Sequence, residues 1–191
     1  MIRHLDGQAE YDQVGAHVMD WRRKRNLPAE NARPVLEALR DEREMVALVD
    51  TDTNTPVAVL QLHRTTVAAP PWTLHENARP TLVVSCAATA PGNGYRLGWL
   101  LTIWARHYAA LCGYTRIACA VPLRHADDWE GQRLVGHLVS RCGWDRVSTA
   151  ASEGTAVLLA ADACRAEGLE AYLGCEVPVQ PALLAEEGVA S

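Results

Sequence analysis

Several features typical of other protein classes are missing from this sequence of 191 residues. No apolar run approaches the roughly 20 residues that a membrane-spanning helix needs, so we expect no membrane partner. The first residues, MIRHLDGQ, lack the apolar core of a signal peptide, and nothing therefore indicates export. We expect a cytoplasmic protein.

The chain also lacks a surplus of basic residues, since its net charge is -5 and its pI is near 5.8. This balance argues against a nucleic-acid partner, because duplex binding depends on a basic face. The single basic cluster, Arg22 to Arg25, ends a predicted helix. Positive charges complement the helix dipole there, so we interpret the cluster as part of the helix end and not as a binding patch.

The cysteines show neither a C-x-x-C pair nor a histidine at metal-ligand spacing. Most of them stand within apolar runs, which favours small buried hydrophobes over a zinc site or a disulfide framework. We therefore predict no metal site. The six cysteines are Cys86, Cys112, Cys119, Cys142, Cys164 and Cys175.

What the chain does contain is typical of one globular domain, with 49% hydrophobic and 21% charged residues. Apolar spacing, β-rich runs and turn residues predict the order of its elements. We assign residues 1–161 to the main domain and expect residues 162–191 to form a short helix and a flexible tail. The expected elements are a strand at 2–5, helices at 8–25 and 29–43, strands at 44–50 and 56–63, a strand from 81, a helix ending at 113, a strand at 115–121, a helix at 129–142, strands at 144–150 and 155–161, and a short helix within 164–173.

The stretch from Thr81 to Val121 carries most of the functional information. It reads as an apolar run, a glycine loop (PGNGYRLG), an amphipathic run closed by Gly113, and a second apolar run. Two buried strands joined through a helix predict a right-handed crossover and a parallel pair. A Gly-rich turn that opens a helix gathers backbone N–H groups and the positive end of the helix dipole, which suits a phosphate.

This order of elements, with the glycine motif, resembles the GCN5-related N-acetyltransferase (GNAT) family. The family motif is Gln or Arg, two residues, Gly, one residue, then Gly or Ala, and it corresponds here to the six residues from Asn93 to Gly98. The Gly113-Tyr114 pair fixes the register. Two positions depart from the pattern: Asn93 replaces Gln or Arg, and Arg96 replaces the middle glycine. Arg96 either obstructs the pyrophosphate or adds a charge-assisted bond to it, and the sequence leaves both open.

The resemblance implies an α/β (α+β) fold with a mixed, mostly antiparallel central sheet, a splayed parallel pair formed by the fourth and fifth strands, and helices on both faces. It also implies acetyl-CoA or another acyl-CoA as cosubstrate. The pantetheine arm would pair with the backbone of the fourth strand, and the pyrophosphate would lie on the glycine turn. The implied cofactor-binding residues are Val84, Cys86, Ala88, Asn93, Gly94, Tyr95, Arg96, Leu97, Gly98 and Gln132.

A second local likeness lies in the run GQRLVGHLVSRCGW, which resembles the family's next helix. Gln132 stands at the family's Asn position, and Val139 stands where a Tyr is commonly the general acid. No general acid can therefore be assigned. His137 points to nearly the opposite side of the helix and is interpreted as a surface residue. Ser140 and Cys142 flank the position without sharing its register, and Cys142 is expected to pack in the core.

Three residues are candidate general bases for an acceptor amine. Glu76 and His75 directly precede the fourth strand, on the side where an amine would approach, although both also fit solvated loop residues. His63 ends the third strand and faces either the cleft or solvent. Trp72, in the proline-marked loop before them, is a candidate substrate contact or a loop anchor.

Three functions follow from these observations. The first is acyl-CoA-dependent N-acyltransfer, most simply acetyl transfer, to a primary amine of a small molecule or peptide by direct attack. The second is a degenerate GNAT domain that binds acyl-CoA without catalysis. The third is a dinucleotide site, because Gly92, Gly94 and Gly98 follow a strand, but the next strand does not end in the acidic residue that would hold a ribose. The oligomeric state stays open, with a homodimer as one option.

Overall fold

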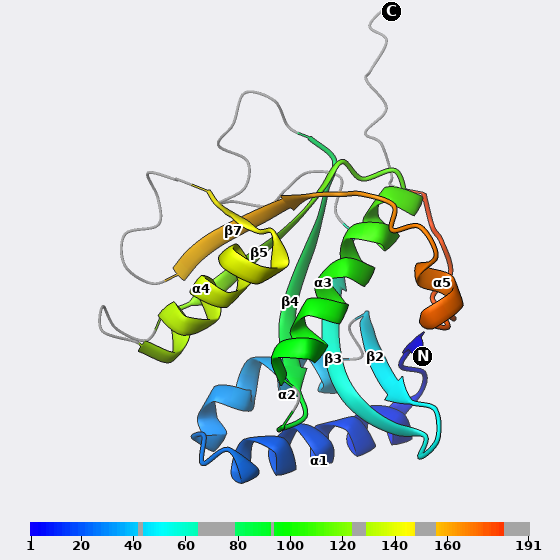
Figure 1. Ribbon diagram of the computed structural model, residues 1–191. Helices are drawn as coiled ribbons and strands as arrows, with labels where there is room; N and C mark the ends of the chain where they lie inside the picture. Colours follow the sequence, from blue (N-terminus) through cyan, green and yellow to red (C-terminus); the bar gives the residue numbers. More distant parts are fainter. Residues whose placement is uncertain (42–43, 65–78, 93, 124–128, 148–155, 182–191) are drawn as a thin grey trace, which may run out of the picture. The chain divides into compact units, whose positions relative to one another are not determined.

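The computed structural model describes residues 1–41, 44–64, 79–92, 94–123, 129–147 and 156–181 (Figure 1). Glu76, His75, Trp72 and Asn93 lie outside the described residues. The elements in chain order are β1 (Ile2–His4), α1 (Gln8–Lys24), a 3-10 turn (Ala29–Ala32), α2 (Arg33–Arg40), β2 (Met45–Asp50), β3 (Thr55–His63), β4 (Thr81–Thr89), α3 (Gly94–Leu111), β5 (Arg116–Pro122), α4 (Trp129–Cys142), β6 (Asp145–Arg146), β7 (Ala156–Asp162) and α5 (Leu169–Tyr172).

The seven strands form one sheet in the order β1-β2-β3-β4-β5-β7-β6. The β1–β2, β2–β3, β5–β7 and β6–β7 pairs are antiparallel, and the β4–β5 pair is parallel. The predicted α/β class, with a mostly antiparallel sheet and a parallel pair after the glycine turn, is confirmed. No helix in the described part of the chain combines the length and hydrophobicity that a bilayer crossing requires.

Residue contacts divide the chain into two compact units, and the first comprises 1–63, 84–104 and 166–178. Its core forms because alternate residues of β2 and β3 meet the apolar stripe of α1 and α2. Cys86, Ala88 and Ala90 pack against this core from β4 and the residue that follows it. The buried core residues include Tyr11, Val14, Val18, Trp21, Val35, Leu39, Met45, Ala47, Val49 and Val59.

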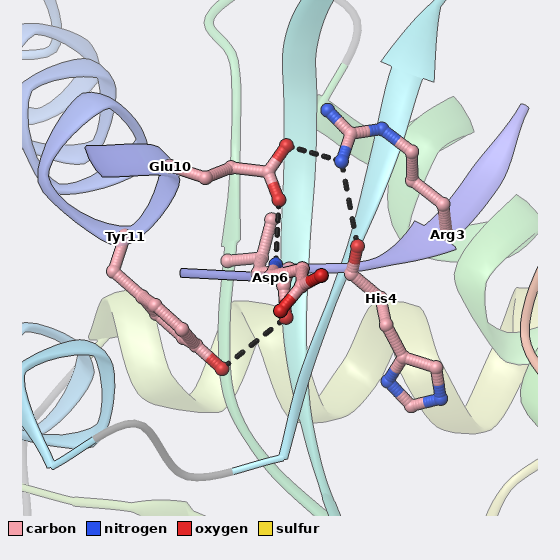
Figure 2. Close-up of polar contacts among 6 residues, drawn as sticks. Arg3, His4, Asp6, Glu10 and Tyr11 are labelled. Carbon is pink, nitrogen blue, oxygen red and sulfur yellow. Dashed lines mark hydrogen bonds and ion pairs between the residues drawn. The ribbon is translucent and has the colours of Figure 1, made fainter. Parts of the chain in front are cut away.

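The turn from β1 into α1 is fixed by polar contacts from the first helical turn (Figure 2). Glu10 forms an ion pair with Arg3, and its second oxygen accepts a hydrogen bond from the Asp6 N–H at 2.6 Å. The Tyr11 hydroxyl donates to the Leu5 carbonyl at 3.3 Å. Glu10 thus bonds the N–H of Asp6, the residue before the N-cap Gly7, which is one residue earlier than in a capping box. These contacts fix the beginning of α1 relative to β1.

A segment near the C-terminus lies alongside β1 and pairs with it at Ile2. The Ile2 N–H donates to Gly174 O at 2.7 Å, and Glu176 N–H donates to Ile2 O at 2.8 Å. Leu173 and Val177 are buried beside it, with 6% and 5% of their surface exposed. The segment therefore covers the outer edge of β1 at Ile2, where backbone groups would otherwise lack partners.

The second unit comprises 64–83, 105–165 and 179–191. Its strands form the β5–β7 ladder, from Arg116↔Asp162 to Pro122↔Ala156, and the first three residues of β4 pair with β5. Burial is the main cause that lowers the pKa of Arg116, and its Nε donates to the buried Thr81 hydroxyl at 2.6 Å. This contact ties the beginning of β4 to the beginning of β5.

Three expectations differ from the structure. The helix expected at 29–43 is a 3-10 turn followed by the eight residues of α2, because Pro34 lies in the first turn of α2, where its missing N–H is tolerated. The strand expected at 144–150 is only β6, while 148–150 lie outside the described residues. Cys164 and Cys175 are exposed and not buried, since they lie on either side of α5 in segments with little secondary structure.

Candidate functional site

The site begins at an irregularity in β4. Cys86, in the middle of the strand, has a φ of +51°, a left-handed conformation that is uncommon for residues other than glycine. The β4–β5 ladder runs only from Thr81↔Arg116 to Val83↔Ala118, whereas β4 continues to Thr89. Beyond Val83, the edge of β4 toward β5 therefore has no ladder partner among the residues that the structure describes. An extended edge of this kind can pair its backbone donors and acceptors with those of a ligand.

The chain passes directly from this part of β4 through the glycine turn into α3 (Figure 1). Gly92 has a φ of +90°, which explains why a glycine is needed there. A Cβ on Gly98 would meet no heavy atom within 4 Å, so the surface beside this glycine is open. The first turn of α3 contains no acidic residue, and Arg96 is exposed on it. This helix N-terminus therefore offers N–H groups and positive charge to an anion.

Arg25, at the end of α1, contacts the entry to the same turn. Its guanidinium donates to Ala90 O at 2.7 Å and to the Thr89 hydroxyl at 3.2 Å. The interpretation of the basic cluster as a helix end is thus incomplete, because Arg25 also pins the end of β4. No sequence signal indicates this contact, since the partners lie 64 and 65 residues apart.

His63 lies beside the centre of β4. Its Nε2 is 2.6 Å from the Ser85 hydroxyl, and that hydroxyl donates to Gln61 Oε1 at 3.1 Å. Because side chains alternate along β3, Gln61 and His63 share the face of Val59, which belongs to the core beneath α1 and α2. Among the candidate bases, His63 alone lies within the described residues. His63 is adjacent to the part of β4 beyond Val83, where the ladder with β5 has ended.

The remaining candidates lie on α4, in the second unit. Gln132 is exposed, and Val139, at the position of the expected tyrosine, is 37% exposed. Cys142 is buried as expected, but His137 is half-buried and its Nε2 is 3.6 Å from the Cys142 sulfur, so it is not simply a surface residue. The structure thus supplies no general acid at position 139.

Comparisons with known proteins identify this architecture. No protein-family model matches the chain, and neither does any curated protein. Solved structures do match. A GNAT-family acetyltransferase from Listeria monocytogenes has a TM-score of 0.56 at 7% identity, over 85% of this chain and 94% of that one. The aminoglycoside 6'-N-acetyltransferase from Enterococcus faecium has a TM-score of 0.54 at 13% identity, over 86% and 97%.

A spermidine N-acetyltransferase chimera that includes the Vibrio cholerae sequence has a TM-score of 0.51 at 13% identity, over 85% of this chain and 95% of that one. The protein has the GNAT fold. At these identities the likeness establishes the fold alone, and the chemistry depends on the site residues.

The GNAT fold also bears on the dinucleotide hypothesis. A dinucleotide-binding fold is built on a mostly parallel, doubly wound sheet. Here β4–β5 is the parallel pair, and both the β1–β2–β3 side and the β5–β7–β6 side are antiparallel. The glycine turn therefore belongs to a GNAT fold and not to a doubly wound dinucleotide-binding fold.

The candidate site contains two residues that the sequence did not reveal. Gln61 and Ser85 read simply as strand positions, since both stand within β-rich runs. Ser85 contacts His63 and Gln61, which lie 22 and 24 residues away in the sequence, and both contacts depend on the alignment of β3 beside β4. The one available signal is that a long amide interrupts the apolar run PVAVLQLH at a position that becomes 3% exposed.

Proposed function

We propose that the protein is an acyl-CoA-dependent N-acyltransferase that transfers an acyl group, most simply acetyl, to a primary amine. One observation carries the proposal: the part of β4 beyond Val83, where the ladder with β5 has ended, leads through the glycine turn into the N-terminus of α3. We call this stretch the path. This path offers an extended backbone edge followed by an anion site, and coenzyme A combines an extended amide-bearing arm with a pyrophosphate. We assign the activity to residues 1–161.

Different residues along the path would bind different parts of the cosubstrate. Backbone at Val84, Cys86 and Ala88 would pair with the pantetheine amides, and the turn from Asn93 through Gly94, Tyr95 and Leu97 to Gly98 would hold the pyrophosphate. Open space beside Gly98 supports this fit. Arg96 would add a charge-assisted contact, because it is exposed on the first turn of α3. Gln132 is retained as a contact proposed from the motif.

Bound acyl-CoA supplies a thioester whose carbonyl carbon an amine can attack. The chain has to orient the amine, remove its proton and meet the negative charge that develops on the carbonyl oxygen. We assign proton removal to His63, with His75 and Glu76 kept as further candidates. N–H groups of β4 beyond Val83 would donate to the carbonyl oxygen. Water supplies the proton to the departing thiolate, since position 139 carries a valine.

The acceptor is proposed to be a small cationic amine. Among the structural neighbours, one is named for an aminoglycoside and another for spermidine, and both of those compounds carry several amines. A net charge of -5 favours the approach of a cation to this chain. A polyamine, an aminoglycoside and a peptide with a free amine therefore form the test panel.

Two measurements test the proposal. Calorimetric titration with acetyl-CoA is expected to show binding, and thiol release is expected with at least one amine of the panel. His63→Gln should lower kcat/KM by about a hundredfold or more, whereas His17→Gln on α1 should leave it unchanged. Binding without thiol release for any amine would support the degenerate, non-catalytic GNAT domain, which the valine at position 139 favours. Absence of binding contradicts both functions.

A further inference from the structure

The chain is held from two sides where β4 ends. Ala90, the first residue after β4, donates its N–H to Val57 O of β3 at 2.7 Å. Its carbonyl oxygen accepts a hydrogen bond at 2.7 Å from the guanidinium of Arg25, which also donates to the Thr89 hydroxyl at 3.2 Å. Both backbone polar groups of Ala90 are therefore paired, one with the sheet and one with the end of α1.

The Ala90 carbonyl influences how the chain enters the glycine turn. The next residue is Pro91, so the peptide unit between the two has no N–H, and the carbonyl is its one hydrogen-bonding group. Proline also fixes its own φ and restricts the backbone of the residue before it. Few torsions thus remain free between this carbonyl and Gly92, where the backbone turns with a φ of +90°. A hydrogen bond that fixes the carbonyl therefore also fixes the direction in which the turn begins.

The backbone from which Arg25 extends is itself well anchored. The Arg25 N–H donates to Arg22 O at 3.0 Å as α1 ends, and the Leu27 N–H donates to the same oxygen at 3.0 Å. The Arg22 guanidinium donates across the following turn to Pro28 O, at 3.0 Å from Nε and 2.8 Å from a terminal nitrogen. The Arg25 side chain thus reaches the end of β4 from a fixed base.

We propose that Arg25 is a positioning residue that orients the glycine turn, through the Ala90 carbonyl, for the pyrophosphate of acyl-CoA. This inference rests on the proposed function. A turn that is already oriented loses less conformational freedom when the anion binds, which strengthens binding without an added contact to the ligand. Loss of the Arg25 side chain should therefore raise the Kd and the KM of acyl-CoA, whereas kcat at saturating acyl-CoA should stay the same.

Calorimetric titration of the full chain with acetyl-CoA measures the affinity. Arg25→Ala should weaken binding by about three- to tenfold. The free energy of unfolding should change little, because Arg25 is exposed and water can replace its hydrogen bonds. Arg23→Ala is the matched control, since it removes a positive charge from the same helix end but Arg23 pairs with Asp20, and it should bind as the wild type does. Unchanged affinity in Arg25→Ala, or equal losses in the two variants, overturns the inference.

The choice of acyl donor separates orientation of the turn from a general structural role. Acetylpantetheine carries the thioester and the amide-bearing arm of acetyl-CoA but has no pyrophosphate. In steady-state kinetics, Arg25→Ala should raise the KM of acetyl-CoA with little change in kcat, whereas kcat/KM with acetylpantetheine should equal that of the wild type. Equal losses with both donors overturn the inference. Absence of acetyl-CoA binding by the wild type instead overturns the proposed function.

Hydrogen exchange gives a readout that needs no ligand. The Ala90 amide should exchange faster in Arg25→Ala than in the wild type, because the end of β4 is then held from one side fewer. Arg25→Lys keeps the positive charge but not the planar guanidinium, and its exchange rate should lie between the other two. Exchange at Ala90 that is as slow in Arg25→Ala as in the wild type overturns the inference. If Arg25→Ala does not fold, wild-type exchange and wild-type affinity in Arg25→Lys overturn it.

Discussion

At the scale of single residues, Cys86 marks the point where β4 departs from regular geometry. Its φ of +51° lies in a region that is costly for residues with a Cβ and most costly for β-branched ones. Packing of its side chain against the core beneath α1 and α2 offsets that cost. The conformation therefore belongs to the folded strand and is not a local preference of cysteine.

Replacement of Cys86 by valine tests this view of β4. The free energy of unfolding should fall by about 1–2 kcal/mol, because the branched side chain disfavours a positive φ. Urea denaturation measures the change. Cys119→Val on β5 is the control, since Cys119 is not among the residues with positive φ. Equal losses for the two variants would contradict a conformational origin.

The alkylation rate of the Cys119 thiol can also be predicted. Cys119 is partly exposed as a residue, but burial around its sulfur raises the pKa of its thiol to about 12, so that the thiolate forms only as the pH rises toward that value. At about pH 8 roughly one molecule in ten thousand then carries the thiolate, and alkylation should be roughly a thousandfold slower than for an ordinary thiol. Peptide mapping after iodoacetamide treatment compares Cys119 with the exposed Cys164. Similar rates would contradict the raised pKa of this thiol.

At the same scale, one residue of the candidate site could be selected from the sequence and others could not. His63 could be selected from the sequence because a histidine at a strand end is a plausible base, and its catalytic role stays a prediction. Ser85 and Gln61 could not be selected, because only the alignment of β4 beside β3 brings their side chains together. Arg25 is a similar case, since its contact with Ala90 depends on the packing of α1.

At the scale of elements, the glycine turn and α3 were the most predictable part of the chain. A strand, a turn with glycines and a long amphipathic run each have strong local signals. β4 and β5 begin within one residue of the expected positions, and α3 ends at Leu111, two residues before the expected stop at Gly113. Short elements were less predictable. The two residues of β6 and the division of the second helix at Pro34 depend on pairing and packing that composition does not encode.

Arg96 tests the role of α3 as an anion site. Because it is exposed in the first turn and no acidic residue lies beside it there, Arg96→Ala should weaken CoA binding by about three- to tenfold. The loss should shrink as the salt concentration increases. Calorimetry at two salt concentrations measures both effects, with Arg165→Ala, an exposed arginine elsewhere, as control. Tighter binding by Arg96→Ala would show instead that the side chain obstructs the pyrophosphate.

At the scale of the whole molecule, the GNAT fold was expected from a resemblance, which the order of elements and the glycine motif carried together. Two helices, a hairpin, a strand-turn-helix-strand crossover and a final helix with strands leave few ways to build one sheet, because connections are short and the crossover is right-handed. The acceptor could not be predicted. It depends on side chains from distant segments, of which 65–78, with His75 and Glu76, lie outside the described residues.

Ligand-dependent stability tests the choice of cosubstrate for the whole chain. CoA at about a hundred times its dissociation constant should stabilise the folded state by about 2.7 kcal/mol, which raises the melting temperature. NAD at the same concentration should produce no shift, because the sheet lacks the parallel doubly wound order. Thermal denaturation with each compound makes the comparison. Protection by NAD and not by CoA would favour the dinucleotide site.

The central claim is that this chain joins an acyl group to an amine. Mass spectrometry of a reaction that contains the protein, acetyl-CoA and each amine of the panel tests it most directly. We predict one amine heavier by a single acetyl group, formed together with one equivalent of free CoA thiol and greatly reduced with His63→Gln. Acetyl-CoA that binds but leaves every amine unmodified would contradict the claim.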